Sequence, residues 1–204
     1  MSPTQVSLIA EGSLDELVLR QLLAQNAPHL QAGACYGKRG RDWMDKNLTK
    51  YNNAAQHWPF IALADLERAE CPPDLLHLWF PHGRNDNLQA RIAVRMVETW
   101  LLADREACAE FLGIAVHHIP QFPEAENNPK QLLVNLARRS RFRAIKDDIA
   151  PVPNATSVVG RNYLGQLGKF VIEHWQSNRA QIHSYSLQRA IRALHQFQPN
   201  VPGE

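Results

Sequence analysis

The order of apolar and polar residues predicts alternating strands and helices in the first half of the chain. Short apolar runs at 6–10 and 60–64 are typical of buried strands. Between them, Leu14–Gln25 carries apolar residues at helical spacing, and Lys46–Gln56 has the composition of a polar helix. This alternation favours an α/β fold with a mainly parallel sheet flanked by helices.

The second half of the chain is predicted to be mostly helical. From Arg91 the pattern changes from a possible strand to a clear helix that continues to Leu112, and residues 120–129 have the composition of a linker. We therefore expect two parts, an α/β core over residues 1–120 and a helical extension over residues 121–204 that packs on the core.

Composition limits the class of protein. The net charge of the 204 residues is only +2, so any nucleic-acid binding has to come from a local patch. Three isolated cysteines fit free thiols in a reducing compartment better than a disulfide framework or a zinc site. No apolar stretch approaches the length of a membrane span, and the N-terminus does not have the pattern of a signal peptide. We expect a soluble cytoplasmic protein.

The acids near the first predicted helix have different expected roles. Ser13 and Glu16 fit a capping box, in which each side chain accepts a hydrogen bond from the backbone N–H of the other residue. Asp15 lies in the first turn, where the helix dipole favours a negative charge. Glu11 precedes the helix, at the end of a buried strand, and has no such structural role. It is therefore the first candidate for chemistry.

A second acidic pair has the same placement. Asp65 ends the strand at 60–64, and Glu67 follows two residues later. Because the carboxyl ends of parallel strands open into one crevice, Glu11, Asp15, Asp65 and Glu67 are expected to converge. Oxygen donors without Cys or His favour Mg²⁺ or Mn²⁺ over zinc. Each acid taken alone is also compatible with a surface or capping position.

These motifs resemble the Toprim domain, shared by topoisomerases, primases and overcoming-lysogenization-defect nucleases. The matching residues are Ile9-Ala-Glu-Gly-Ser-Leu-Asp15 and the strand that ends in Asp65-Leu-Glu67. Toprim proteins carry a glutamate after the first strand and an Asp-x-Asp motif at the end of a later strand. The nuclease branch often has a second acid four residues after that glutamate, which corresponds to Asp15. In this chain the usual Asp-x-Asp motif is replaced by Asp65-x-Glu67, in which the second acidic side chain is longer.

A later stretch carries a further resemblance. Arg91-Ile-Ala-Val-Arg-Met-Val-Glu-Thr-Trp-Leu-Leu-Ala-Asp104 looks like an uncharacterised bacterial Toprim-like family, often encoded in defence or mobile islands beside ATPases. The resemblance implies a Toprim-like, Rossmann-like fold and an Mg²⁺-dependent phosphodiesterase or nuclease, such as the effector of a phage-defence or toxin-like system. We predict Glu11, Asp65 and Glu98 as catalytic residues. The alternative is a non-catalytic binding or regulatory subunit of a partner ATPase, with a degenerate site.

Glu98 is open to two interpretations because it lies in a strongly apolar stretch. It is either paired, with Arg91 or Arg95 at helical spacing, or part of the catalytic site. Arg95 could equally face a phosphate group.

Two basic segments are candidates for contact with nucleic acid. Lys38 and Arg39 lie in a Gly-flanked turn that could present cations to a phosphate. A second segment concentrates positive charge that suits a nucleic-acid backbone. Asp147 and Asp148 follow it directly, so a salt-bridged helix end is the alternative interpretation. The residues of this second segment are Arg138, Arg139, Arg141, Arg143 and Lys146.

Overall fold

The computed structural model describes residues 2–200, which form two compact units. The sheet unit comprises residues up to Val94 together with the chain from Gln188 onward. The helical unit comprises Arg95–Leu187. The chain therefore leaves the sheet unit directly after the last strand and returns to it near the end, a division that differs from the predicted boundary at residue 120.

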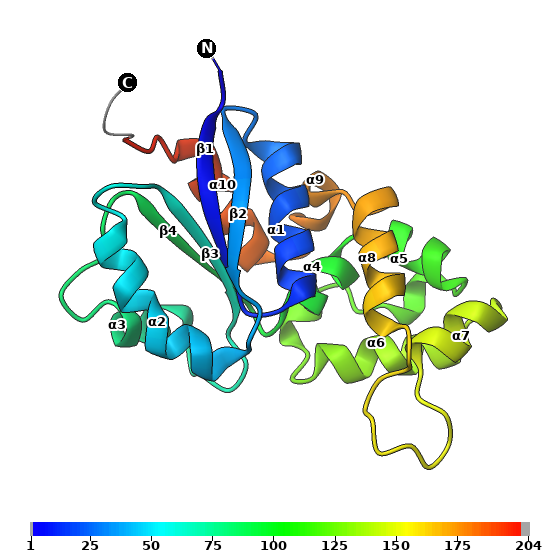
Figure 1. The fold of residues 1–204 in the computed structure, drawn as a ribbon. Helices are drawn as coiled ribbons and strands as arrows, with labels where there is room; N and C mark the ends of the chain where they lie inside the picture. Colours follow the sequence, from blue (N-terminus) through cyan, green and yellow to red (C-terminus); the bar gives the residue numbers. More distant parts are fainter. Residues whose placement is uncertain (1, 201–204) are drawn as a thin grey trace. The chain divides into compact units, whose positions relative to one another are not determined.

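The sheet unit alternates strands and helices, as the sequence pattern predicts. Its elements up to Val94 are β1 (Thr4–Ala10), α1 (Ser13–Asn26), β2 (Leu30–Gly37), α2 (Arg41–Ala54), β3 (Phe60–Asp65), α3 (Pro72–Trp79) and β4 (Leu88–Ala93). All strand pairs are parallel, and the strand order is β2-β1-β3-β4. The predicted α/β fold with a parallel sheet is confirmed (Figure 1).

The strand order fixes where a ligand site is favoured. The chain passes from β1 outward to β2, and then crosses back to place β3 on the other side of β1. A crevice forms at such a switch point, beyond the carboxyl ends of the two central strands. Here these strands are β1 and β3, which pair directly in a register that places Ala10 opposite Leu63.

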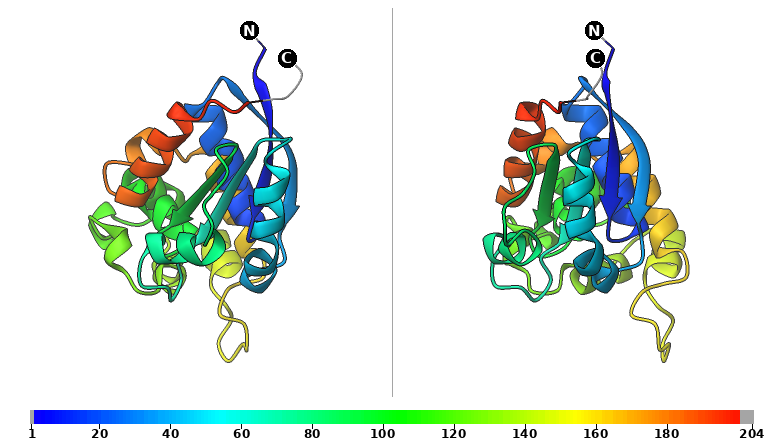
Figure 2. Two further views of the ribbon diagram at one scale, coloured as in Figure 1. Left: turned by 90° about the vertical axis from the view of Figure 1, so that its left-hand side faces the viewer. Right: turned by 60° about the vertical axis from the view of Figure 1, so that its left-hand side comes forward.

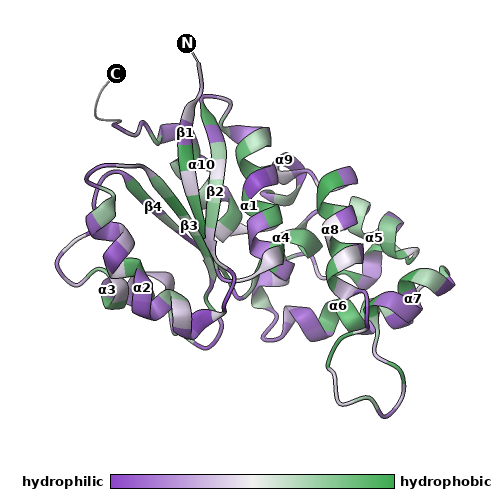
Figure 3. Ribbon diagram, viewed as in Figure 1, coloured by the Kyte–Doolittle hydropathy of each residue, from purple (hydrophilic) through white to green (hydrophobic). Residues whose placement is uncertain are grey.

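Helices cover both faces of the sheet because its strands are apolar on both sides. Phe60, Ala62 and Ala64 of β3 pack with residues of α2 and α3. Ile61 and Leu63 are also buried and point to the opposite face, since side chains alternate along a strand. Helix α1 contacts β1, β2 and β3. Figure 2 shows α2 and α1 on opposite sides of the strands, and Figure 3 shows hydrophobic colour along β3 beside a largely hydrophilic α2.

Several boundaries in the sheet unit differ from the sequence prediction. Helix α2 begins at Arg41, five residues before the predicted start at Lys46. Its N-cap is Gly40, whose φ of 79° lies in the region that glycine adopts without strain. The apolar residues from Leu75 to Trp79 belong to α3, which opens on two prolines, a favoured start for a helix.

The prediction that the second half of the chain is mainly helical is confirmed, and most of its helices belong to the helical unit. Its elements are α4 (Val97–Ala103), α5 (Arg105–Leu112), η1 (Val116–His118), η2 (Pro123–Ala125), α6 (Pro129–Arg138), α7 (Arg143–Ile149), α8 (Tyr163–Glu173) and α9 (Ser177–Ala180). Helix α10 (Tyr185–Gln196) begins in this unit, and its residues 188–196 belong to the sheet unit. Asn128 caps α6 as the N-cap, with its side chain accepting from the backbone N–H of Gln131.

The predicted helix that continues to Leu112 is broken at Asp104. The Asp104 side chain is fully buried and accepts hydrogen bonds from Arg179, at 2.8 Å for Nε and 2.8 Å for Nη2, and from the backbone N–H of Gln176 at 2.8 Å. These bonds hold the backbone of Asp104 outside helical geometry, with ψ at 69°. A long-range ion pair thus overrides a local helical pattern.

Two tryptophans stabilise the core of the helical unit. Trp100 and Trp175 are fully buried. Trp175 Nε1 donates to the backbone O of Trp100 at 2.9 Å, and Trp100 Nε1 donates to Ser186 Oγ at 2.8 Å. Buried indole N–H groups need such partners, so both rings act in packing.

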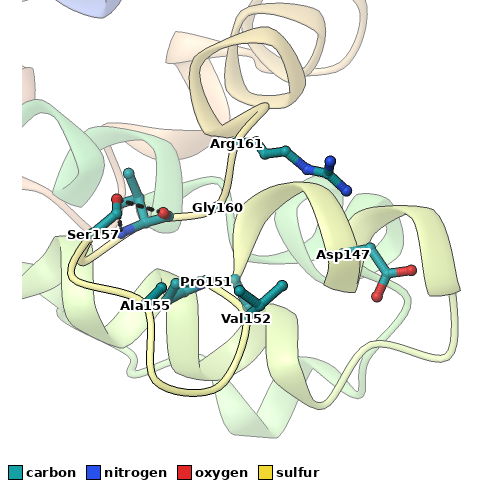
Figure 4. Close-up of a pocket in the computed structure, with 9 residues that line it drawn as sticks. Asp147, Pro151, Val152, Ala155, Ser157, Gly160 and Arg161 are labelled. Atoms are coloured by element: carbon teal, nitrogen blue, oxygen red, sulfur yellow. Dashed lines mark hydrogen bonds between the residues drawn. The ribbon is translucent and has the colours of Figure 1, made fainter.

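A hollow of about 540 Å³ lies beside the loop that joins α7 to α8 (Figure 4). The loop is closed by backbone hydrogen bonds from Gly160 to Ile149 at 2.8 Å and from Asn162 to Asp148 at 3.1 Å. Asp147 and Arg161 are the charged side chains of the lining, and none of the predicted site residues lines this hollow. Within residues 2–200, no helix has the length and apolar character needed to cross a membrane.

Candidate acidic site

The predicted acids that follow β1 and β3 lie at the same edge of the sheet. Glu11 is the first residue after β1, and Asp65 is the last residue of β3. Because the two strands are adjacent and parallel, the switch point lies between their carboxyl ends. Glu67 follows Asp65 in the connection to α3. We call Glu11, Asp65 and Glu67 the acidic site.

Arg41, the first residue of α2, connects the three members of the acidic site. Its Nη2 lies 3.7 Å from Glu11 Oε2, and its Nε lies 3.8 Å from Glu67 Oε2. The same Nη2 donates a hydrogen bond to the backbone carbonyl of Asp65. A guanidinium therefore lies among the groups that the sequence assigns to a metal.

The turn after β2 positions Arg41. The backbone N–H of Lys38 donates to the carbonyl of Ala10 at 2.8 Å, and that of Gly40 donates to the carbonyl of Glu11 at 3.0 Å. These bonds attach the start of α2 to the end of β1. The guanidinium also lies over the ring of Trp79, 5.4 Å from its centroid, which favours a cation at this point.

The sequence pattern does not identify Arg41 as a member of the site. It indicates the basic turn at Gly37-Lys-Arg-Gly40 but predicts a helix only from Lys46, which leaves Arg41 without a structural role. The available signal is Gly40 itself, since a glycine before a polar helix is a possible N-cap. A helix that starts after Gly40 has Arg41 in its first turn.

Glu11 is the most electrostatically perturbed acid of the site. Its side chain is only 12% exposed, and its Oε2 atom is buried without a hydrogen-bond partner among the described residues. Burial raises the pKa of Glu11, and the negative charges of Glu67 and Asp45 raise it further. Arg41 and a hydrogen bond with the backbone of Asp65 oppose this shift without cancelling it. A buried carboxylate oxygen that accepts no hydrogen bond is costly, and the ion pair with Arg41 at 3.7 Å relieves that cost less than a directly bound cation would.

Two non-glycine residues near the acidic site have left-handed backbone conformations. Glu67 has a φ of 50° and Lys38 a φ of 61°. Such conformations are uncommon outside glycine and occur preferentially where the backbone serves a functional site. Glu67, which has this backbone conformation, also carries the carboxylate that forms an ion pair with Arg41.

Asp15 has the capping role that the sequence pattern assigns to Glu16. The N-cap of α1 is Gly12 instead of Ser13, and the N–H of Gly12 donates to Asp15 Oδ2 at 2.9 Å. Gly12 has no side chain, so only this half of a capping box can form. The predicted pair of Ser13 and Glu16 is wrong, because the helix begins one residue earlier than expected. Asp15 is engaged at the start of its own helix.

Glu16 is instead held by two cations. Arg20 Nη2 and Lys38 Nζ each lie 2.8 Å from its carboxylate oxygens. Partial burial raises the pKa of Glu16, but the hydrogen bonds from Lys38 and Arg20 outweigh it, and the net pKa lies below the usual value. The predicted phosphate ligand Lys38 is thus paired with an acid, while its neighbour Arg39 is exposed.

The donor chemistry of the acidic site suits a hard cation, but its present arrangement is not a metal centre. Glu11, Asp65 and Glu67 offer only oxygen donors, which Mg²⁺ and Mn²⁺ prefer. Within residues 2–200, no group of three or more His, Cys, Asp or Glu residues is arranged so that it could hold a metal ion. Arg41 contacts both Glu11 and Glu67, so these carboxylates would have to exchange the guanidinium for an ion.

Glu98 belongs to the helical unit, whereas the acidic site belongs to the sheet unit. Its side chain is almost fully buried in α4, and its Oε1 accepts from the hydroxyl of Tyr163 at 2.9 Å and lies 3.5 Å from Lys130 Nζ. The cation that pairs with Glu98 is therefore Lys130 and not Arg91 or Arg95, the partners that the sequence predicts. Lys130 lies on a different helix, so no helical spacing relates it to Glu98. Arg95 lies half-buried between β4 and α4.

The basic segment from Arg138 to Lys146 is exposed over most of its length. The predicted ion pairing with the following acids is present only in part: Arg143 Nε lies 3.4 Å from Asp147 Oδ2. Asp148 instead accepts from Asn162 and Gln166. Arg141 lies over the ring of Phe142, 4.9 Å from its centroid. The remaining cations face solvent at the end of α6 and the start of α7.

Comparison of the chain with protein-family models, with curated proteins and with solved structures found no match in any of the three.

Proposed function

We propose that the chain is an Mg²⁺- or Mn²⁺-dependent phosphodiesterase that cleaves nucleic acid at the acidic site. The observation that carries this proposal is the buried Oε2 of Glu11, which has no hydrogen-bond partner among the described residues and lies at the switch point of a parallel sheet. Asp65 and Glu67 supply further oxygen donors at the same edge. The resemblance to Toprim nucleases supports the same chemistry.

Each residue has a distinct role in this proposal. Glu11, Asp65 and Glu67 would hold the ion, and Asp15 could join them if its bond to Gly12 opened. A divalent ion in such a site offsets the charge of the phosphate and activates the attacking water. Glu11 would act either as an ionised ligand of the ion or as the general base that accepts the proton of that water. Arg41, once displaced from the carboxylates, would face the non-bridging phosphate oxygens.

The basic segment supports a nucleic-acid substrate. Exposed arginines next to the half-exposed ring of Phe142 combine phosphate contacts with a surface on which a base can stack. We expect the reaction to take place in the cytoplasm, because Cys35, Cys71 and Cys108 are all free thiols. A role in phage defence would follow if cleavage were directed at invading nucleic acid.

Cleavage of plasmid DNA and of single-stranded RNA with Mg²⁺ or Mn²⁺ tests the proposal. We expect the wild-type protein to nick or degrade one of these substrates, and Glu11→Gln and Asp65→Asn to reduce the rate by at least about 100-fold, as expected for the loss of a group that acts in the transition state. Glu16→Gln is the matched control. It also removes a carboxylate near the start of α1, but the Glu16 carboxylate is paired with Arg20 and Lys38 and does not belong to the acidic site. Equal rates for Glu11→Gln and wild-type protein would contradict the proposal.

One observation favours a second candidate, a non-catalytic subunit that works through a partner ATPase. Arg41 already contacts Glu11 and Glu67, so the acids are partly neutralised without an ion. Metal affinity discriminates between the two candidates. If the site is catalytic, Arg41→Gln should raise Mn²⁺ affinity by about tenfold, because a competing cation is removed, and should lower the cleavage rate. If the site is degenerate, neither wild-type protein nor Arg41→Gln should bind Mn²⁺.

A further inference from the structure

The loop that joins α7 to α8 is apolar and encloses a hollow. Residues 150–160 carry no charged side chain, although Asp148 and Arg161 lie close on either side of them. The hollow has a volume of about 540 Å³, within the range that small ligands fill. Apolar side chains gathered at an exposed cavity mark a binding surface. Those that line this hollow belong to Ala150, Pro151, Val152, Ala155 and Val159.

Contacts at the base of the loop fix the wall of the hollow. A Cβ atom on Gly160 would lie 2.3 Å from the backbone O of Asp148, so the loop can return this close to α7 only with glycine there. The N–H of Gly160 donates to the carbonyl of Ile149 at 2.8 Å. The Asp148 carboxylate accepts from Gln166 Nε2 at 2.6 Å and from Asn162 Nδ2 at 3.1 Å. These bonds join the end of α7 to the start of α8, so the hollow is part of the folded unit.

The hollow adjoins the basic segment through α7. Asp147 and Arg161 are its charged lining residues, and in the view of Figure 4 both lie at one end of it. Arg143 Nε lies 3.4 Å from Asp147 Oδ2, a contact that uses one of the two carboxylate oxygens. Lys146 precedes Asp147 and is exposed. The uncharged wall of the hollow therefore ends at a group of exposed cations, with the carboxylate of Asp147 among them.

One strand of nucleic acid can cover both the basic segment and the hollow. Helix α7 rises about 1.5 Å per residue, so Asp147 lies roughly 7 Å along the helix axis from Phe142. Successive phosphates of one strand follow each other about every 3.4 Å along a duplex. A strand whose phosphates contact Arg141 and Arg143 therefore reaches the hollow within a few nucleotides.

The chemistry of the hollow selects a nucleobase as its ligand. Proteins that bind an unstacked base hold its faces between apolar side chains and bind the polar atoms of its edge. Val152 and its apolar neighbours offer the first kind of contact, and Asp147 offers an acceptor for the second. A free phosphate ion would meet the Asp147 carboxylate, and a cation would meet the surrounding arginines. A nucleotide avoids both conflicts, because its base is uncharged and its phosphate can stay outside the hollow, on Arg143 or Arg161.

We propose that this hollow binds an unpaired base of the nucleic acid whose backbone the basic segment contacts. The base must be unpaired, because a duplex keeps the faces and the pairing edge of each base occupied. The ligand is thus single-stranded DNA or RNA. This inference rests on the proposed function for its nucleic-acid ligand, but it requires neither a metal ion nor cleavage at the acidic site.

Asp147 selects among the bases. A carboxylate only accepts hydrogen bonds, so it favours a base that carries an amino group and disfavours one that presents a carbonyl oxygen at the same place. Cytosine and thymine have rings of the same size and differ in this group, with an N4 amino group in cytosine and an O4 carbonyl in thymine. We therefore expect the hollow to bind cytosine more tightly than thymine.

Fluorescence anisotropy of the full chain in metal-free buffer, with labelled oligo(dC) and an abasic strand of the same length, tests the hollow. We expect Val152→Ser to weaken binding of oligo(dC) by about tenfold, the effect of losing one held base, and to leave binding of the abasic strand unchanged. Val158→Ser is the matched control, because Val158 lies in the same loop and is 67% exposed, against 64% for Val152, but does not line the hollow. Equal affinity of the wild-type protein for the two probes would overturn the proposal, and so would equal effects of the two substitutions on oligo(dC).

Asp147→Asn tests the selectivity in the same assay. The wild-type protein should bind oligo(dC) about fivefold more tightly than oligo(dT), and the ratio should approach one in the variant, because an amide both donates and accepts. The ratio is the readout, since removal of a negative charge raises the affinity for every strand alike. An unchanged ratio would overturn the role of Asp147, and loss of base-dependent binding in the wild-type protein would overturn the site itself.

Binding and cleavage give separate results. Glu11→Gln should keep the preference for oligo(dC) over the abasic strand, because Glu11 lies outside the helical unit. A wild-type protein that cleaves nothing but keeps this preference would contradict the nuclease and support the hollow. Cleavage that depends on Glu11, together with equal binding of oligo(dC) and the abasic strand, would support the nuclease and contradict the hollow.

Discussion

Glu11 and Glu16 lie five residues apart and have opposite electrostatic environments. Glu11 is buried, with one oxygen lacking a hydrogen-bond partner among the described residues, and its pKa is raised. Glu16 is bound by Arg20 and Lys38, and its pKa is lowered. The ionised form of Glu11 therefore weakens the fold, whereas the ionised form of Glu16 stabilises it. In the proposed function, this contrast separates Glu11, which acts in the site, from Glu16, which stabilises the fold.

The pH dependence of stability should differ in sign between the two glutamates. With Glu11, the folded state binds its proton more tightly than the unfolded state, so stability falls as the pH rises from about 4.5 through the raised pKa. In metal-free buffer, Glu11→Gln should therefore melt at or above the wild-type Tm at pH 7, and this advantage should vanish below pH 4.5. Thermal melting from pH 4 to 8 measures the difference.

Glu16→Gln supplies the control for this comparison. The stabilisation by Glu16 is present above the usual pKa of 4.5 and is lost as the pH falls through its lowered pKa. The variant should therefore melt below wild-type protein at pH 7 and approach it under acidic conditions. A lower Tm for Glu11→Gln than for Glu16→Gln at pH 7 would contradict the assignment of the two roles.

Asp15 should matter for the stability of α1 more than Ser13 does. Asp15→Ala removes the acceptor of the Gly12 N–H and should cost about 1 kcal/mol of unfolding free energy, the usual value of a helix cap. Ser13 is exposed and is not the N-cap, so Ser13→Ala should change stability by less than about 0.5 kcal/mol. Urea denaturation of both variants checks the order, and a larger loss for Ser13→Ala would restore the capping box predicted from the sequence.

At the scale of elements, the sequence predicts the strands better than the points where helices begin. The apolar runs that form β1 and β3 are strong local signals, and acids that follow parallel strands must lie at one edge of the sheet. The N-cap of α2 is Gly40, whose left-handed φ of 79° is a geometry that glycine permits, and the N-cap of α1 is Gly12 in an ordinary extended conformation; neither position gives a periodic signal in the sequence. For this reason the sequence pattern does not predict the position of Arg41.

Long-range ion pairs are the other feature that a local pattern cannot predict. Asp104 meets Arg179, and Glu98 meets Lys130, across separations of 75 and 32 residues that no periodicity relates. Both acids lie in apolar stretches, so their burial could be predicted, but their partners could not. The partners depend on how the helices of the helical unit pack.

Breaking the buried ion pair of Asp104 should destabilise the helical unit strongly. Asp104→Ala removes the acceptor of hydrogen bonds from Arg179 and from the backbone of Gln176, and should cost about 1.5–3 kcal/mol, the range for hydrogen bonds to a charged group. The Arg179 side chain is 47% exposed, so its charge can be solvated in the variant. Asp147→Ala breaks the exposed pair with Arg143 and should cost at most about 1 kcal/mol. Chemical denaturation followed by tryptophan fluorescence compares the two variants, and similar losses for both would contradict this account.

At the scale of the whole molecule, the proposal assigns catalysis to the sheet unit and part of substrate binding to the helical unit. The acidic site belongs to the former, and the exposed arginines of the basic segment belong to the latter. The two functions should therefore be separable by substitution. Loss of the basic segment should weaken binding of nucleic acid without removing the metal ligands.

Substitution of the basic segment tests this separation. Arg138→Gln, Arg139→Gln and Arg141→Gln combined should weaken binding to an oligonucleotide, and should reduce the slope of log affinity against log salt by about 0.7–0.9 for each phosphate that the variant no longer neutralises. The thermal stability of the helical unit should change little, because all three residues are exposed. Fluorescence anisotropy over a range of salt concentrations measures the slope, and an unchanged slope would place the nucleic acid elsewhere.

Anomalous scattering from crystals soaked in Mn²⁺ tests the central claim most directly. The account predicts a manganese peak within coordination distance of carboxylate oxygens from both Glu11 and Asp65, with the guanidinium of Arg41 moved away from Glu11. Crystals of Glu11→Gln should lack that peak, and crystals of Glu16→Gln should retain it. A Mn²⁺-soaked wild-type crystal without a peak between Glu11 and Asp65, and with Arg41 still bound to Glu11, would contradict a catalytic metal site.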